Sequence, residues 1–363
     1  MPSADDIPSQ TPGLDLAGDV VALAAALVNT PSVSGTETAL ADALEAALRA
    51  VGHLQVDRDG DAVVARTAVG GAGRVLLAGH IDTVPAAANL PGVLAGDRLV
   101  GLGAADMKGG VAVLAHLAAT VAAPARDVTY VFYDGEEIEE EANGLRRLAQ
   151  RHPAWLAADF AVLAEPSNAQ VEAGCQGTLR VVVHTEGRRA HSARSWLGEN
   201  AIHALAEPLR RLQEYVPRRP VLNGLQYREG LTAVRISGGV AGNVVPDAAE
   251  LTVNYRFAPD RSADEAVAHV REVFAGFSVA VTDLAAGALP GLDRPEAAAF
   301  LDAVGADPKP KLGWTDVARF TELGIPAVNY GPGDPALAHT AEEWVATEQI
   351  RHCADRLRAW LTT

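Results

Sequence analysis

Short apolar runs alternate with longer helix-like stretches through the first half of the chain. Three runs are continuous and apolar, which predicts strands buried on both faces. They lie at 74–78, 128–133 and 160–164. Three Ala/Leu-rich stretches have helical spacing, at 16–28, 36–50 and 111–121. This alternation predicts an α/β fold, in which a mixed, mostly parallel sheet carries helices on both faces.

One helix start carries a local signal of its own. Ser34 is followed three residues later by Glu37, at the start of the helical stretch 36–50. A Ser side chain can accept the amide of the third helical residue while a Glu at that position reaches back, so this pair predicts a capping box.

The pattern changes after Cys175, where apolar and polar residues alternate as in strands with one solvated face. Four strands and two helices are predicted in the order strand, helix, strand, strand, helix, strand, which is ferredoxin-like. Their ranges are 178–186, 199–215, 232–240, 250–257, 262–274 and 278–282. We therefore predict an inserted α+β domain at 177–284. The catalytic domain would comprise 1–176 and 285–363.

Charge narrows the range of partners. The chain has 363 residues, with 30 Lys and Arg against 46 Asp and Glu, which gives a net charge of −16. A surface of this sign repels nucleic acid and anionic membranes, so we expect neither as a partner. The longest apolar run, Val20–Val28, has nine residues, far fewer than the ~20 that span a bilayer.

The expected location is the cytoplasm. Residues 1–10 are acidic and polar and lack the basic and apolar regions of a secretory leader. Cys175 and Cys353 are the only cysteines, and they predict neither a disulfide framework nor a cysteine-ligated zinc site.

Side chains that bind metals follow the predicted strands. His80, Glu136, Glu137 and Glu165 lie at or just past a strand end, and Asp82, Asp106 and the distant His339 complete the set. The carboxyl ends of parallel strands meet at one edge of a sheet, where ligands bind. Imidazoles and carboxylates suit Zn²⁺ or a similar divalent ion, and this set is large enough for two ions that share a carboxylate.

Each of these residues also has an ordinary structural explanation. Asp82 could cap a turn, Asp106 could cap a helix, and 136–141, with five glutamates in six residues, could be a solvated face. Their shared position at strand ends favours a metal site over these explanations.

Four motifs occur in order along the first half of the chain. They are Gly79-His80-Ile81-Asp82-Thr83-Val84-Pro85, Gly101-Leu102-Gly103-Ala104-Ala105-Asp106-Met107-Lys108-Gly109-Gly110, Asp134-Gly135-Glu136-Glu137 and Glu165-Pro166. Together with the late His339, they resemble the motifs of the M20 family of dizinc peptidases and deacylases. The resemblance extends along nearly the whole chain. It implies a zinc-peptidase-like catalytic domain, an inserted lid and dimerisation domain, and two Zn²⁺ ions, for which Co²⁺ can substitute.

The resemblance implies metal binding by five residues. His80 and Glu165 would hold the first zinc, Glu137 and His339 would hold the second, and Asp106 would bridge the two. The peptide bond that follows the bridging aspartate, Asp106–Met107, is expected to be cis.

Catalytic roles are implied for three further residues. Asp82 would sit behind His80 and fix its ring. Glu136 would take a proton from the water that bridges the metals and pass it to the leaving amine. His191 would reach the active site of a neighbouring subunit and donate to the tetrahedral oxyanion, which implies a homodimer formed through the inserted domain.

Substrate contacts are implied for four residues. Asn243 and Arg256 lie in segments that resemble the family's contacts to a substrate carboxylate. Thr315 falls where relatives touch the substrate, and Arg180 is a further candidate on the inserted domain, near the cluster at 188–194 that contains three arginines.

Three segments, 174–180, 191–198 and 313–320, look like those of the desuccinylases of high-GC bacteria. The implied substrate is a small N-acyl amino acid. The implied reaction removes succinate from N-succinyl-LL-2,6-diaminopimelate to give LL-diaminopimelate, in diaminopimelate and lysine biosynthesis.

Other functions stay open at this point. An acetylornithine deacetylase, an aminoacylase or a carboxypeptidase of the same family would share the metal ligands. A dinucleotide-binding protein is disfavoured because 101–103 is only a fragment of the glycine fingerprint, with Asp106 in place of its third glycine. A non-catalytic binding module would be expected to lack a ligand or the base, and all are present.

Overall fold

The computed structural model describes residues 13–71 and 73–363, so the expectation about a secretory leader, which rests on 1–10, lies outside the described part. The described residues form two compact units. The first unit contains the chain up to Ala173 together with 291–309 and 319–363. The second unit contains 174–290 and 310–318.

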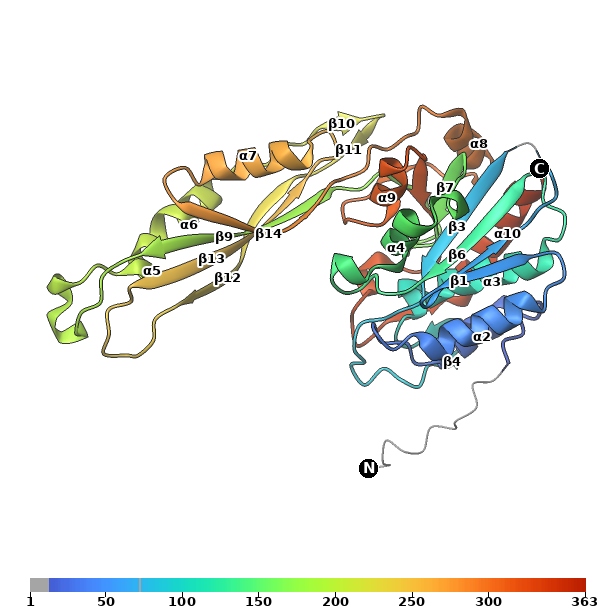
Figure 1. Cartoon of the computed structure of the whole chain (residues 1–363), viewed down its shortest axis with the longest axis horizontal. Coiled ribbons are helices and arrows are strands. Elements are labelled where there is room, and N and C mark those ends of the chain that lie inside the picture. Colours follow the sequence, from blue (N-terminus) through green and yellow to red (C-terminus); the bar gives the residue numbers. More distant parts are fainter. Residues whose placement is uncertain (1–12, 72) are drawn as a thin grey trace, which may run out of the picture. The chain divides into compact units, whose positions relative to one another are not determined.

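An eight-stranded sheet forms the centre of the first unit (Figure 1), in the order β1-β2-β6-β3-β7-β16-β8-β15. The strands are β1 (Gln55–Asp59), β2 (Ala62–Arg66), β3 (Arg74–His80), β6 (Asp127–Tyr133), β7 (Phe160–Leu163), β8 (Glu172–Ala173), β15 (Lys309–Pro310) and β16 (Ala327–Asn329). β3 runs parallel to β6 and β7, and β16 runs parallel to β7. β1 and β2 extend this parallel centre as an antiparallel hairpin. The predicted mixed α/β sheet is confirmed.

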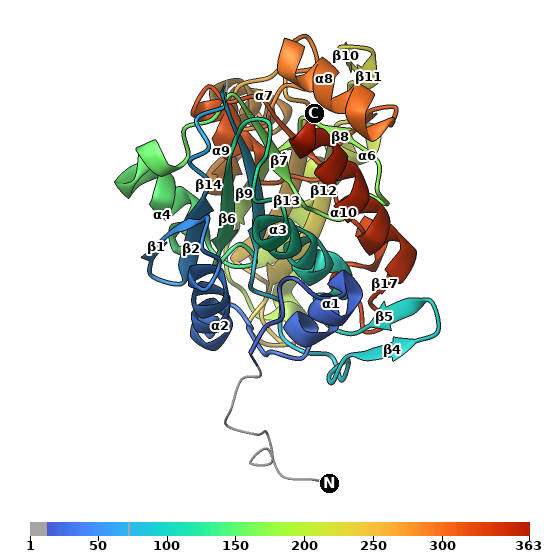
Figure 2. The same ribbon diagram turned by 90° about the vertical axis from the view of Figure 1, so that its right-hand side faces the viewer.

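β3, β6 and β7 are buried along nearly their whole length, which shows that helices cover both faces of the sheet. α3 packs against α1 and α10 and contacts β3 and β6 (Figure 2). α2 contacts β1 and β2, and α4 contacts β2. The helices of this part are α1 (Val20–Val28), α2 (Thr38–Arg49), α3 (Gly109–Thr120), α4 (Gly144–Arg151), α8 (Pro295–Val304), α9 (Val317–Glu322) and α10 (Thr347–Thr362).

A small three-stranded sheet in the first unit was not predicted. It has the order β17-β5-β4, with β4 (Val93–Ala95), β5 (Arg98–Val100) and β17 (Trp344–Ala346). Strands of three residues are too short to show a hydrophobic period. The pairing of β17 with β5 brings the chain after His339 beside the chain that leads to Asp106.

The second unit has a four-stranded antiparallel sheet in the order β12-β13-β9-β14. Its elements are β9 (Gly177–Glu186), α5 (Ala201–Ala204), α6 (Ala206–Glu214), β10 (Val221–Leu222), β11 (Leu225–Gln226), β12 (Gly230–Gly238), β13 (Ala248–Phe257), α7 (Ala263–Val273) and β14 (Ser278–Ala285). Alternate residues of β9 and β13, such as Val181 and Val253, form the core with residues of α7 such as Val270. The order of strands and helices is the ferredoxin-like order expected from the sequence.

The second unit differs from the predicted inserted domain at its edges. Cys175 and Ala288 pair as an antiparallel bridge beyond both predicted boundaries. The Trp314 indole donates to the Ala286 carbonyl at 3.0 Å, within the same unit. The segment 310–318 therefore packs with the second unit, which the sequence did not predict because nothing local marks such a distant contact. The functional division at 177–284 stays a prediction.

Two expectations about the whole chain can be compared with the described part. Cys175 and Cys353 are both buried free thiols. Among the described helices, none combines the length and the apolar run that crossing a bilayer requires.

Candidate metal centre

The parallel strands of the first unit bring the predicted ligands to one edge of the sheet. His80 is the last residue of β3, Glu136 and Glu137 follow β6, and Glu165 follows β7. β6 and β7 are the two parallel neighbours of β3, so these three strands end side by side. The fold therefore places the side chains at adjacent strand ends, as the sequence predicted.

Ligand atoms from six residues converge there. They form three groups, and within each group the ligand atoms lie within 4.8 Å of one another. The groups are His80 with Asp106 and Glu165, Asp106 with Glu137 and His339, and His80 with Glu136 and Glu137. The first two groups contain the two predicted ligand sets, and they share Asp106.

Asp106 lies between the two imidazoles and offers a different oxygen to each. Its Oδ1 is 3.1 Å from His80 Nε2, and its Oδ2 is 3.5 Å from His339 Nε2. His339 Nε2 also lies 2.9 Å from Glu137 Oε1. Two imidazoles and three carboxylates in this arrangement fit two divalent cations that share one carboxylate.

The nearby carboxylates raise the pKa values of both histidines. Hydrogen bonds to Asp106 and Glu137 raise the pKa of His339 to about 10. Burial lowers the pKa of His80, but its hydrogen bonds to Asp106 and Asp82 outweigh burial and raise it well above the usual value. The carboxylates thus attract positive charge to the place where the cations would bind.

Asp82 contacts more of the site than predicted. Its carbonyl is 3.1 Å and its Oδ1 is 3.4 Å from His80 Nδ1, so it lies behind the ring. Its carboxylate also accepts the backbone amides of Glu136 and Glu137, at 3.1 and 3.0 Å. Burial raises the pKa of Asp82, whereas His80, the Glu137 amide and the Ser34 hydroxyl lower it to about 2. One ionised carboxylate therefore holds both the His80 ring and the glutamate loop.

The capping box predicted from Ser34 and Glu37 is wrong. Glu37 stands at the N-cap of α2 and no side chain caps that helix. The Ser34 hydroxyl instead donates to Asp82 Oδ2 at 2.7 Å, and Glu37 Oε1 accepts the Gly135 amide at 3.2 Å. Both side chains stabilise the metal centre, because the buried loops there supply donors and acceptors that need partners.

Arg147, on α4, supports the glutamate loop and was missed by the sequence analysis. Its guanidinium donates to both oxygens of Asp134, at 3.1 and 2.6 Å, just before Glu136 and Glu137. It also donates to Asp59 at 2.8 Å. An arginine on an amphipathic helix gives no sequence signal that distinguishes such an anchor from a surface charge.

The peptide bond Asp106–Met107 is cis, as the resemblance implied.

Two of the predicted catalytic and substrate residues lie together in the second unit. His191 and Val244 pair as an antiparallel bridge, and the Ser192 amide donates to the Asn243 carbonyl at 2.9 Å. His191 Nδ1 accepts the Ala193 amide at 3.1 Å. A neutral ring that accepts at Nδ1 carries its proton on Nε2, so this nitrogen is a donor.

The predicted arginines of the second unit fall into two classes. Arg180 and Arg256 lie on the face of the sheet opposite the buried core. On the same face, Asn254, two residues before Arg256 on β13, is the partner of Arg180 on β9. Burial and the charge of Arg180 lower the pKa of Arg256. Arg188 and Arg189, near His191, form ion pairs with acidic residues of their own unit, and Arg180 also lies 3.9 Å from Asp283.

Thr315 belongs to the segment 310–318 of the second unit and is buried. Its carbonyl accepts a weak hydrogen bond from Cys175 Sγ at 3.6 Å. The structure therefore groups Thr315 with the second unit.

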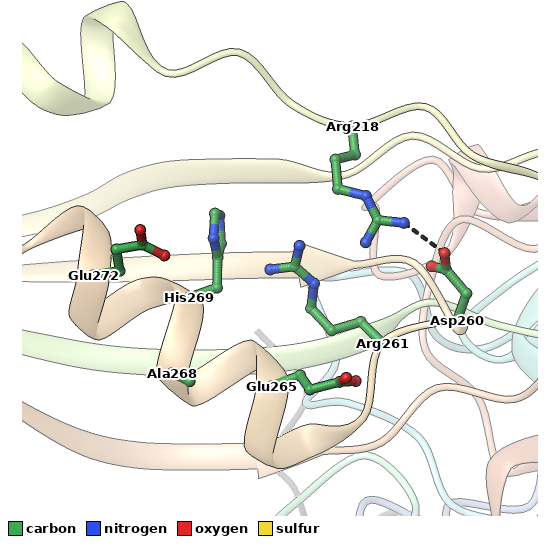
Figure 3. Close-up of a pocket in the computed structure, with 7 residues that line it drawn as sticks. All are labelled: Arg218, Asp260, Arg261, Glu265, Ala268, His269 and Glu272. Atoms are coloured by element: carbon green, nitrogen blue, oxygen red, sulfur yellow. Dashed lines mark hydrogen bonds and ion pairs between the residues drawn. The ribbon is translucent and has the colours of Figure 1, made fainter.

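A pocket beside α7 contains none of the predicted site residues (Figure 3). Its lining contains two arginines, Arg218 and Arg261, and the acidic residues Asp260, Glu265 and Glu272. Arg218 donates to Asp260. The lining has three acidic residues against two arginines and contains none of the groups of possible metal ligands, so the metal centre remains the candidate site.

Comparison with known proteins agrees with this site. The profile of peptidase family M20/M25/M40 matches residues 76–363. DapE of Mycobacterium tuberculosis, named provisionally as a succinyl-diaminopimelate desuccinylase, is 57% identical over 96% of this chain and 99% of its own length. The succinyl-diaminopimelate desuccinylase of Corynebacterium glutamicum is 46% identical over 97% of this chain and 98% of its own length.

A solved structure shares the fold at low sequence identity. The YXEP protein of Bacillus subtilis, described as a dinuclear metal-binding peptidase from the M20 family, superposes with a TM-score of 0.66. The match covers 94% of this chain and 96% of that protein at 17% identity. Since the family profile spans well over half of the sequence, this chain belongs to peptidase family M20/M25/M40.

Proposed function

We propose that this chain hydrolyses N-succinyl-LL-2,6-diaminopimelate to LL-diaminopimelate and succinate. The observation that carries the chemistry is the convergence of two imidazoles and three carboxylates, one of which is the shared Asp106, with Glu136 beside them. The names of relatives that are 57% and 46% identical over nearly the whole chain support the choice of acyl group.

The proposed cofactor is a pair of Zn²⁺ ions, with Co²⁺ as a possible substitute. His80 and Glu165 would hold one ion, Glu137 and His339 the other, and Asp106 both. Bound divalent ions supply Lewis acidity, which polarises an amide carbonyl and lowers the pKa of water. The protein fixes the ligands through Asp82, which orients the His80 ring and the loop of Glu137.

Glu136 is the proposed general base and acid. Its carboxylate lies among ligand atoms of His80 and Glu137, and its backbone is held by Asp82. It would accept a proton from the attacking water and deliver it to the amide nitrogen as the C–N bond breaks. An amine leaves poorly unless it is protonated, so one carboxylate serves both steps.

His191 is proposed to donate its Nε2 proton to the oxyanion of the tetrahedral intermediate in a neighbouring subunit. The amide of Ala193 occupies Nδ1, which leaves the neutral ring with a donor at Nε2. Removal of one such donor typically costs about 10²–10³-fold in kcat.

This role needs a second copy of the chain, and we propose a homodimer formed through the second unit. β12 lies at the edge of its sheet and carries two apolar side chains that are more than half exposed, Val234 and Ile236. Val240, just beyond the strand, is exposed to a similar degree. A long apolar edge strand pairs readily with another strand, and a second copy offers the same edge.

We expect Ile236→Lys to yield a monomer. A charge on the edge strand opposes strand pairing between copies. Because His191 would then lack a recipient site, kcat should fall by about 10²–10³-fold while metal content stays the same. Light scattering gives the mass, and Val93→Lys, which charges an exposed edge strand of the first unit, is the matched control. A wild-type chain that is a fully active monomer would refute both the dimer and the role of His191.

Arg256, with Arg180 and Asn243, is proposed to bind the carboxylates of the substrate. A guanidinium can grip a carboxylate through two parallel hydrogen bonds. We expect Arg256→Gln to raise KM by about 10-fold or more, since hydrogen bonds between charged groups contribute about 1.5–3 kcal/mol. Arg271→Gln, an exposed substitution on α7, is the control. An unchanged KM for the succinylated substrate would remove Arg256 from the binding site.

Thr315 is the remaining proposed substrate contact, and 177–284 is the proposed lid. We also propose a cytoplasmic location, because both cysteines are free thiols, as is usual in reducing compartments.

The acyl group is tested by comparing two substrates. The rate of amide-bond loss is measured for N-succinyl-LL-diaminopimelate and N-acetylornithine with the same protein sample. We expect a kcat/KM at least 10²-fold higher for the succinylated substrate, since the proposed arginines would bind its two additional carboxylates. Preference for the acetylated substrate would assign the chain to the acetylornithine deacetylase branch of the family.

A further inference from the structure

We propose that Glu343 is a positioning residue of the metal centre, which holds the bridging Asp106 in place. Three backbone amides converge on its carboxylate. Oε2 accepts the amide of Gly103 at 2.9 Å, and Oε1 accepts those of Ala105 and Asp106 at 2.9 and 3.0 Å. The inference rests on the proposed metal-dependent function.

The contact acts directly on the backbone of Asp106. The segment that ends at Asp106 is irregular, with Gly103 in the left-handed region at φ 75° and Asp106 at φ −120° and ψ 96°. No regular helix or strand satisfies these amides, so the Glu343 carboxylate is their partner. Asp106 offers one oxygen to each imidazole, so a shift of its Cα would alter both contacts at once.

Glu343 also ties Asp106 to the strand that follows the other imidazole. It lies four residues beyond His339, and its carbonyl accepts the amide of Gly101 at 3.0 Å. The next residue begins β17, which pairs with β5. The backbone and side chain of Glu343 thus join the segment of Asp106 to the segment of His339 on either side of the proposed metal pair.

The burial of Glu343 makes its partners hard to replace. The residue is 1% exposed, so water offers little substitute for a lost hydrogen bond. A carboxylate that accepts three amides forms stronger bonds than a neutral acceptor would. In Glu343→Gln, one oxygen becomes an NH₂ group that faces a backbone amide, so at least one donor among Gly103, Ala105 and Asp106 loses its acceptor.

The test is a Co²⁺ titration of the metal-free protein, followed by visible absorbance and by metal content per chain. The variants are Glu343→Gln and Glu343→Asp, whose shorter side chain keeps the charge but withdraws it from the amides. Glu342→Gln, an exposed neighbour, is the matched control. We expect both Glu343 variants to bind Co²⁺ about 10–100-fold more weakly and to give an altered absorbance spectrum, and the control to match wild type.

Thermal unfolding of the metal-free proteins shows whether each variant is folded. If Glu343→Gln does not fold, Glu343→Asp decides by the same titration. Folded variants with wild-type affinity and spectrum would overturn the proposal and leave Glu343 as an ordinary buried contact. A wild-type chain that bound no Co²⁺ would instead refute the proposed metal-dependent function, so the two failures are distinguishable.

Discussion

Replacing Glu136 with glutamine is expected to lower kcat by about 10²–10⁴-fold, the usual contribution of a general acid and base. Gln has nearly the same shape as Glu but cannot accept a proton at neutral pH. The backbone of residue 136 would keep its hydrogen bond to Asp82, because that bond uses the amide. KM and metal content should therefore change little while the rate collapses.

The metal content of Glu136→Gln carries as much information as its rate. Glu136 lies in a group with His80 and Glu137 that could itself hold an ion. Loss of an ion from this variant would show that Glu136 is a ligand and not the base. Glu141→Gln, an exposed substitution in the same run of glutamates, should behave as wild type. A rate for Glu136→Gln near that of wild type would remove Glu136 from the mechanism.

Asp106→Asn is expected to have the largest effect on metal binding. The carboxylate offers Oδ1 toward His80 and Oδ2 toward His339, whereas an asparagine has only one oxygen and carries no charge. It can contact one cation but cannot bridge two. We expect the metal content to fall from two ions per chain to one or fewer, and turnover to fall below detection.

Metal content measured by elemental analysis after dialysis tests this directly. Asp97→Asn, on the exposed turn between β4 and β5, is the matched control. Two tightly held ions in Asp106→Asn would mean that another carboxylate bridges the pair. Glu137 would then be the first residue to examine, since it approaches both His80 and His339.

The ligands could be predicted from sequence because their positions follow from short-range rules. Buried strands appear as apolar runs, and the polar residues that end parallel neighbours must meet at one edge. His80 and Glu165 are of this kind. Asp106 and His339 follow no strand of the central sheet, so the order of motifs and the family resemblance were needed to include them.

The supporting contacts could not be predicted because they join distant parts of the chain. Glu343 accepts amides from residues 237 to 240 positions earlier. Ser34 and Glu37 looked like a helix cap, but the loops beside Asp82 and Gly135 compete for the same side chains. A local sequence pattern indicates only the partners that a side chain could have nearby in the chain. In the folded protein, Ser34 and Glu37 bond to distant residues in place of those partners.

The most direct test of the account is succinate release from N-succinyl-LL-diaminopimelate before and after treatment with a chelator. We expect turnover by the Zn²⁺-loaded protein, loss of turnover when the metal is removed, and recovery on addition of Zn²⁺ or Co²⁺. Turnover that survives complete removal of the metal, or none in the fully loaded protein, would contradict a metal-dependent desuccinylase.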